Sequence, residues 1–141
     1  MKLPQPGGCL CGAVRYEVRQ APSRTWTCHC TQCQRATGSA FTIVIAVPSD
    51  GFEILEGELR SVNFTSDSGR VRTNWNCAQC GSFMLAGSDP RLAPTKPNRA
   101  VAGGTLDDTS WLQPTTYYWV CKKQPWIELP VGDTIHETQD Y

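Results

Sequence analysis

Grouped cysteines constrain this 141-residue chain more than any other feature of its sequence. Seven of the eight cysteines form a C-x-C pair, a C-x-C-x-x-C trio and a C-x-x-C pair: Cys9 and Cys11; Cys28, Cys30 and Cys33; Cys77 and Cys80. Thiols two or three residues apart are poor disulfide partners, because the ring that they would close is strained. The same spacing lets several sulfurs bind one soft cation, so the sequence predicts metal sites. A disulfide framework and unliganded thiols are the alternatives.

The number of sulfurs in a group indicates what a bound metal can do there. Four sulfurs close a tetrahedral shell around Zn²⁺, as in structural sites, whereas three leave one position for water or substrate, as in catalytic sites. We therefore expect Cys9, Cys11, Cys77 and Cys80 to hold a structural zinc and the trio to hold a catalytic zinc. A second structural zinc, completed by His29 or by a distant group, is the alternative for the trio. An extended backbone would turn the His29 side chain away from a metal that its two neighbours share.

Composition and charge exclude several classes of protein. The formal net charge is zero and 40% of the residues are apolar, so neither a disordered chain nor a polyanion-binding protein is indicated. The first eight residues contain no apolar signal segment, and the longest apolar run, residues 41–47, is too short to span a bilayer. We expect one domain over residues 1–141, a cytoplasmic location, and neither a membrane nor a nucleic-acid partner.

Alternating apolar and polar residues predict a mainly β protein. Val14, Tyr16 and Val18, for example, would share one face of a strand whose other face is charged. Short strands with glycine-bearing turns between them favour a β-sandwich or a related folded sheet. Because the two outer cysteine pairs are expected to share one metal, the strands expected at residues 13–18 and 70–75 must be neighbours in space. The expected strands cover residues 13–18, 41–47, 52–55, 59–64, 70–75, 99–102 and 117–121.

The remaining segments are expected to be short or irregular. A single helical turn is predicted after Cys30, with Thr31 as its N-cap, Gln34 completing a capping box and Gly38 ending it. Residues 86–99 contain three prolines and predict a loop long enough to form a flap over a site. Residues 1–8 read as a polar lead-in, and residues 130–141 as a polar tail.

Three further residues have two interpretations each, and two others have a single default interpretation. Arg35, two residues beyond the trio, either binds an anionic substrate or pairs with a carboxylate. Trp26 and Trp75 each precede a cysteine by two residues and belong either to the core or to the wall of a metal cleft. We expect Cys121 to be buried in the core and His136 to lie at the surface.

The cysteine groups with their flanking residues resemble the family of glutathione-dependent formaldehyde-activating enzymes and centromere protein V, over roughly residues 5–130. Three stretches carry the resemblance: Gly8 to Val14, Cys28 to Arg35 with Gly38-Ser39, and Cys77 to Ser82. It implies an Mss4-like fold of mostly antiparallel strands, with the same division into a structural and a catalytic zinc. It also implies a carbon–sulfur lyase that adds the glutathione thiol to formaldehyde, giving S-(hydroxymethyl)glutathione.

The sequence hypothesis is therefore a small enzyme with two Zn²⁺ per chain that acts on a small-molecule thiol and a small aldehyde. Coordination deprotonates a bound thiol near neutral pH, and an aldehyde placed beside it would be attacked without a further encounter. Cys28, Cys30 and Cys33 would form the catalytic site, with Arg35 as a candidate contact for a substrate anion. Two alternatives stay open: a non-catalytic zinc module that binds a protein, and a zinc enzyme of the same fold that acts on another metabolite.

Overall fold

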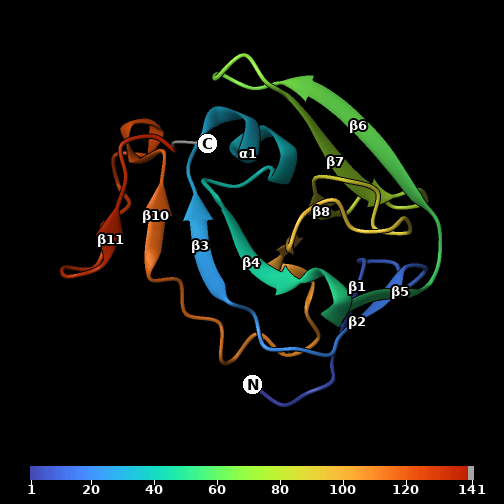
Figure 1. The fold of residues 1–141 in the computed structure, drawn as a ribbon. Coiled ribbons are helices and arrows are strands. Elements are labelled where there is room, and N and C mark those ends of the chain that lie inside the picture. The colour runs from blue at the N-terminus through green and yellow to red at the C-terminus, as the bar shows by residue number, and fades with distance from the viewer. Residues whose placement is uncertain (140–141) are drawn as a thin grey trace.

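The computed structural model describes residues 1–139, which form two β-sheets and one short α-helix (Figure 1). The smaller sheet has the antiparallel order β1-β2-β5, and the larger has the order β11-β10-β3-β4-β9-β8-β7-β6. This arrangement confirms the mainly β prediction. The strands are β1 (Gln5–Gly8), β2 (Arg15–Val18), β3 (Arg24–Cys28), β4 (Thr42–Pro48), β5 (Phe52–Glu56), β6 (Leu59–Thr65), β7 (Val71–Cys77), β8 (Phe83–Ala86), β9 (Asn98–Ala102), β10 (Thr116–Tyr118) and β11 (Thr134–Ile135).

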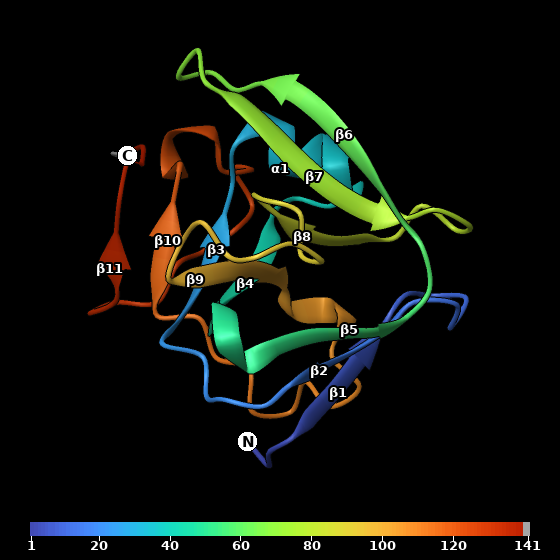
Figure 2. The same cartoon turned by 45° about the vertical axis from the view of Figure 1, so that its right-hand side comes forward.

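The helix α1 (Thr31–Thr37) lies between the two ends of the larger sheet (Figures 1 and 2). On one side of it are β10 and the 3₁₀ turn η3 (Val120–Lys122), and on the other is the β6–β7 hairpin, drawn in green in Figure 2. The remaining 3₁₀ turns are η1 (Ser49–Gly51) and η2 (Gly103–Thr105). No helix in the described part of the chain is long and apolar enough to cross a membrane.

The larger sheet buries side chains on both faces. Along β4, Ile45 and Val47 point into a core that also contains Tyr16 of the smaller sheet, while Val44 and Ala46 belong to a second apolar cluster on the opposite face. A strand buried on both faces reads as an unbroken apolar run, which is why residues 41–47 could be recognised in the sequence. The first face holds the two sheets together, and the second faces the cysteine trio.

Four strands have no clear signal in the sequence. β1 contains Pro6 and two glycines, β3 is short and polar except for Trp26, and β8 and β11 are also short. These segments become strands because their partners fix them: β1 pairs with β2, β3 with β4, β8 with β7 and β11 with β10. β11 lies within the segment expected to be a tail, of which residues 140–141 fall outside the described residues.

Other differences follow from tertiary structure. The strands next to the outer cysteine pairs, β2 and β7, belong to different sheets and do not pair, so only the turns at their ends need to meet. The backbone leaves β10 at Trp119, which has the left-handed φ of 58°, and residues 120–122 form η3 instead of continuing the strand. Residues 87–97 form the irregular loop that the prolines predicted.

Gly7 places β1 against β2, because a side chain at this position has no space. A Cβ atom there would overlap the Tyr16 ring and lie 2.7 Å from the Thr105 carbonyl oxygen. The Tyr16 ring is buried, and its hydroxyl is hydrogen-bonded to the Thr105 hydroxyl at 2.8 Å. The ring therefore cannot move aside without losing its packing and this hydrogen bond. The close approach of β1 holds the turn that carries Cys9 and Cys11.

We predict that Gly7→Ala lowers the free energy of unfolding by about 2 kcal/mol, as overpacking of a filled interior does. Gly104→Ala is the matched control, because a Cβ atom there meets nothing within 4 Å, and we expect it to change stability by less than about 0.5 kcal/mol. Chemical denaturation of both variants measures the difference. Equal stability of the two variants would show that β1 does not need this close approach.

Candidate metal centres and cavity

The trio lies at the junction between β3 and α1. Cys28 is the last residue of β3, and Cys30 is the N-cap of α1, with its Sγ atom accepting a hydrogen bond from the Cys33 backbone N–H at 3.4 Å. The predicted N-cap, Thr31, is therefore one residue too late. Gln34 does not complete a capping box, since its amide donates to the His29 carbonyl at 2.6 Å, whereas Gly38 ends the helix in the left-handed conformation as predicted.

The three sulfurs fit the ligand set of a single metal ion. The Sγ atoms of Cys28, Cys30 and Cys33 all lie within 4.8 Å of one another. A zinc ion bound to sulfur at 2.3 Å with tetrahedral angles separates its ligands by about 3.8 Å, so small side-chain adjustments suffice. Within residues 1–139, no further cysteine, histidine or carboxylate joins this group. The donor set thus suits Zn²⁺ with three protein ligands.

The pKa values of the three thiols indicate that the trio cannot ionise fully without a cation. Hydrogen bonding from the Cys28 thiol lowers the pKa of Cys30 to about 3, while the same interaction raises the pKa of Cys28 to about 12. Interaction with these two sulfurs and burial also raise the pKa of Cys33. One negative charge is thus shared by three thiols, and further ionisation is unfavourable until a cation offsets the repulsion.

The outer cysteines converge from two distant parts of the chain. Cys9 and Cys11 lie in the turn between β1 and β2, Cys77 ends β7, and Cys80 lies in the turn after it. Their sulfurs lie within 4.8 Å of one another, with 3.4 Å between Cys9 and Cys11 and 3.9 Å between Cys11 and Cys77. Four thiols in this arrangement fit a closed tetrahedral shell.

Hydrogen bonds hold this group in place. The Val14 backbone N–H donates to the Cys9 sulfur at 3.2 Å. The Ser82 hydroxyl accepts from the Leu10 N–H at 3.1 Å and lies 3.2 Å from the Cys80 sulfur, a contact that lowers the pKa of Cys80 to about 5. Ser82 therefore links the two turns. Ser82 was not a candidate residue in the sequence, although its position two residues after a cysteine is a signal for a supporting residue.

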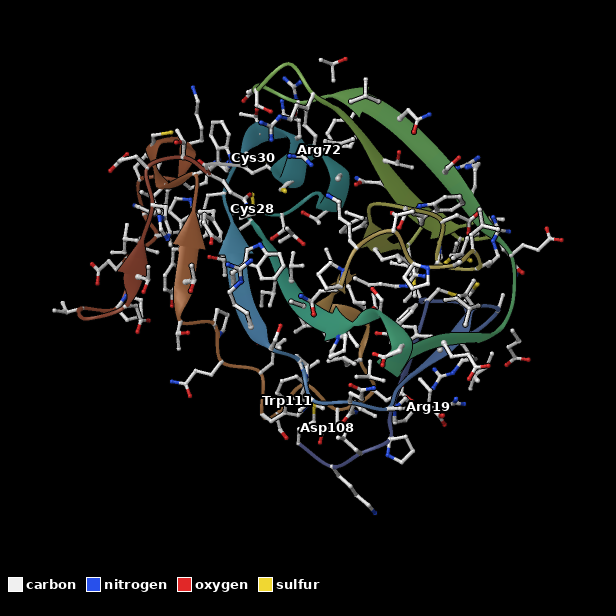
Figure 3. All side chains as sticks on the ribbon, in the orientation of Figure 1. Arg19, Cys28, Cys30, Arg72, Asp108 and Trp111 are labelled. Carbon is white, nitrogen blue, oxygen red and sulfur yellow. The ribbon has the colours of Figure 1, made fainter. Side chains whose placement is uncertain are left out.

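The trio opens onto a cavity of about 470 Å³, whereas the quartet is not part of its lining. The cavity lies between α1, the second face of the larger sheet, the β6–β7 hairpin and the loop 87–97. Trp26 and Trp119 line it beside the sulfurs, and Arg72 and Asn74 line it from β7. Figure 3 shows Arg72 near α1, on the side of the molecule where Cys28 and Cys30 lie. This volume suits a small-molecule ligand.

The two tryptophans that the sequence singled out have different positions. Trp26 lines the cavity next to the trio, with the Arg24 guanidinium over its ring at 4.8 Å from the centroid. Trp75 is buried in the core between the sheets, where its indole N–H donates to the Gly87 carbonyl at 3.0 Å. One tryptophan therefore forms a cavity wall, and the other fixes the start of the loop 87–97.

Two other candidate residues, His29 and Arg35, lie outside the trio or the cavity. His29 is buried, its Nε2 atom lies 3.0 Å from the Thr27 hydroxyl, and burial lowers its pKa, so it is a neutral packing residue outside the trio. Arg35 is exposed in the last turn of α1 and does not line the cavity, so its contact with a substrate stays a prediction.

The expected position of Cys121 is wrong, and His136 is less exposed than expected. Cys121 is exposed in η3 instead of buried, because the chain turns at Trp119 and the strand ends before it. His136 is half-buried, with its ring stacked on Tyr118 at 4.7 Å between centroids. The pairing of β11 with β10 brings His136 to this position, and a tail was expected there.

Comparison with known proteins identifies the family of the chain. Residues 4–122 match the family described as glutathione-dependent formaldehyde-activating enzyme. A solved structure of a Rhodobacter sphaeroides protein superimposes with a TM-score of 0.54 and 19% sequence identity, over 93% of this chain and 98% of that one, which shows a shared fold. Because the family match spans most of the chain and includes both cysteine groups, the protein belongs to the glutathione-dependent formaldehyde-activating enzyme family.

Proposed function

We propose that the protein binds two Zn²⁺ ions and joins a small-molecule thiol to a small aldehyde at the trio, as a carbon–sulfur lyase does in reverse. Glutathione and formaldehyde are the proposed substrates, and S-(hydroxymethyl)glutathione is the product. The observation that carries this proposal is that three converging sulfurs open onto a cavity of small-molecule size. Membership of the family supports the same reaction.

Cys28, Cys30 and Cys33 would hold the catalytic ion, which when bound would lower the pKa of a substrate thiol. In the addition, the substrate sulfur forms a bond to the aldehyde carbon, the carbonyl π electrons move to oxygen, and that oxygen takes up a proton equivalent to the one lost by the thiol. The reaction needs no oxidant or reductant. Trp26 and Trp119 line the cavity and pack in the same apolar cluster as the three cysteines, and this apolar surface would limit water and strengthen electrostatic interactions at the site.

Cys9, Cys11, Cys77 and Cys80 would hold the structural ion. The first two lie in the turn between β1 and β2 of the smaller sheet, and the others lie at the end of β7 of the larger sheet and in the turn after it, so one ion would join both sheets. This joint supports our proposal that residues 1–141 fold as one domain. Seven metal-binding thiols would have to stay reduced until they bind zinc, which supports a cytoplasmic location.

A non-catalytic zinc module that binds a protein is the alternative function. The number of protein ligands at the trio distinguishes it from an enzyme, because a fourth protein ligand would close the site. The cavity beside the sulfurs favours the enzyme, since a module needs no space there.

We predict that Cys30→Ser lowers the zinc content from about two ions per chain to about one and abolishes thiol-dependent formaldehyde consumption. Cys121→Ser is the matched control, because Cys121 is exposed and belongs to neither group, and it should keep both ions and full activity. Elemental analysis and a formaldehyde assay give the two readouts. Loss of one ion with unchanged activity would remove the trio from the mechanism.

We also predict that Cys77→Ser costs more stability than Cys30→Ser. Cys77 is fully buried and would share its ion with Cys11, 66 residues away in sequence, so its loss separates the two sheets. Structural zinc contributes roughly 10 kcal/mol of binding free energy in small modules, so several kcal/mol of the folding free energy should be lost. Denaturant unfolding of the zinc-loaded variants measures this. Retention of two ions and of normal stability by Cys77→Ser would contradict the structural site.

A further inference from the structure

We propose that Arg72 determines substrate specificity by binding a carboxylate of the substrate while the substrate sulfur lies at the trio. This inference rests on the proposed function, because it assigns a second contact to the same substrate. It assigns to Arg72 the anion contact that the sequence analysis considered for Arg35.

Strand alternation directs Arg72 toward the cavity. In β7, Trp75 and Cys77 belong to the core between the sheets, so Arg72 and Asn74 point to the opposite face, and both line the cavity. Asn74 is paired with Ala86, which also lines the cavity. Arg72 is half-buried, and Figure 3 shows it near α1, close in that view to the labelled Cys28 and Cys30. The guanidinium group thus belongs to the same enclosed space as the sulfurs.

Two cationic side chains of the lining can attract an anionic group of a ligand. Arg72 and Lys96 bring positive charge, and Asp67 is the one carboxylate among the described lining residues. The Asp67 carboxylate accepts a hydrogen bond from the Gln32 amide of α1, which holds the tip of the β6–β7 hairpin against the helix. With the one negative charge that the trio shares, the lining as a whole is not cationic, but Arg72 and Lys96 are the groups in it that can attract a substrate carboxylate, and enclosure strengthens this attraction.

A third cation in the lining, Arg99, has a different role. It is paired with Val47, whose side chain belongs to the core face of the sheet, so the Arg99 side chain leaves the strand on that same face. Its guanidinium donates to the carbonyl oxygens of Asp89 and Leu92 at 3.2 and 3.1 Å. Arg99 thus fixes the loop 87–97, which carries Lys96, and Arg72 is the cation that the strand itself aims into the cavity.

Guanidinium and carboxylate groups match in geometry, because two parallel N–H···O bonds can form. A hydrogen bond to a charged group contributes enough free energy to increase the affinity for a ligand about tenfold or more. Arg72 would therefore distinguish a thiol that carries a carboxylate from a neutral thiol of similar size, without contacting the reacting atoms.

The experiment measures binding of two thiols to the cobalt-substituted protein, using the sulfur-to-cobalt absorption as the readout. The probes are 3-mercaptopropionate, which has a carboxylate, and 2-mercaptoethanol, which is neutral. We expect Arg72→Gln to weaken binding of 3-mercaptopropionate about tenfold or more and to change binding of 2-mercaptoethanol less than twofold. Arg72→Lys should recover part of the loss, and Lys96→Gln, in the exposed loop, should cause a smaller loss of the same kind.

Arg60→Gln is the matched control, because Arg60 lies on the same hairpin, is exposed and does not line the cavity. It should leave both affinities unchanged. If Arg72→Gln weakens both thiols equally, or neither, the proposal is wrong. If that variant does not fold, acetate competition with the wild-type protein decides: acetate should weaken binding of 3-mercaptopropionate and leave 2-mercaptoethanol unaffected, and an equal effect on both overturns the proposal.

Failure of the proposed function gives a different result. If neither thiol changes the cobalt spectrum of the wild-type protein, the trio does not bind a substrate sulfur. The carboxylate contact is then tested with 3-(methylthio)propionate, whose sulfur cannot ionise, by NMR titration of the wild-type protein and Arg72→Gln. Binding that is lost in Arg72→Gln supports the anion contact, and identical titrations of the two proteins overturn it.

Discussion

Repulsion between closely spaced sulfurs is the constraint on which the rest of the structure depends. The fold brings seven thiols into two groups in which all sulfurs lie within 4.8 Å, and such groups can ionise fully only around a cation. In the quartet, metal binding would thus be coupled to the joining of the two sheets. In the trio, it would be coupled to the start of α1, since Cys30 is at once a cysteine of the group and the N-cap of the helix. Local structure and metal chemistry therefore stabilise each other.

The larger sheet separates the structural role from the chemical one by using its two faces. One face of β4 packs against the smaller sheet, and the other face forms the floor beside the trio. Trp75 and Arg72 of β7 follow the same division, one in the core and one in the cavity. A rigid sheet that is packed on one face can support a preorganised site on the other. Changes on the cavity face can thus alter specificity with little effect on the core.

The sequence predicted the structure where a local residue pattern determines it, and predicted it less well where pairing between strands determines it. The cysteine spacing indicated both groups, and the apolar run at residues 41–47 indicated β4. β1 could not be predicted from two glycines and a proline, because its conformation depends on β2 and on the space left by Tyr16. Cys121 was misplaced because the left-handed turn at Trp119 leaves no clear local signal in the sequence. The cavity lining from β7 could be found only once the register of the sheets was known.

The two groups also differ in burial. One expects a reactive site to be the more exposed of the two, but the trio is the more buried group. The quartet has two exposed cysteines, Cys11 and Cys80, and two buried ones, whereas the trio has none exposed: Cys28 and Cys30 are buried and Cys33 is half-buried. A quartet would be satisfied by its own four sulfurs, so two of them can be exposed to water. A trio that takes a small ligand gains from enclosure, because charge interactions are stronger away from bulk water. Burial of the three-sulfur group in the cavity that Arg72 also lines therefore suits the proposed binding of a thiol that carries a carboxylate.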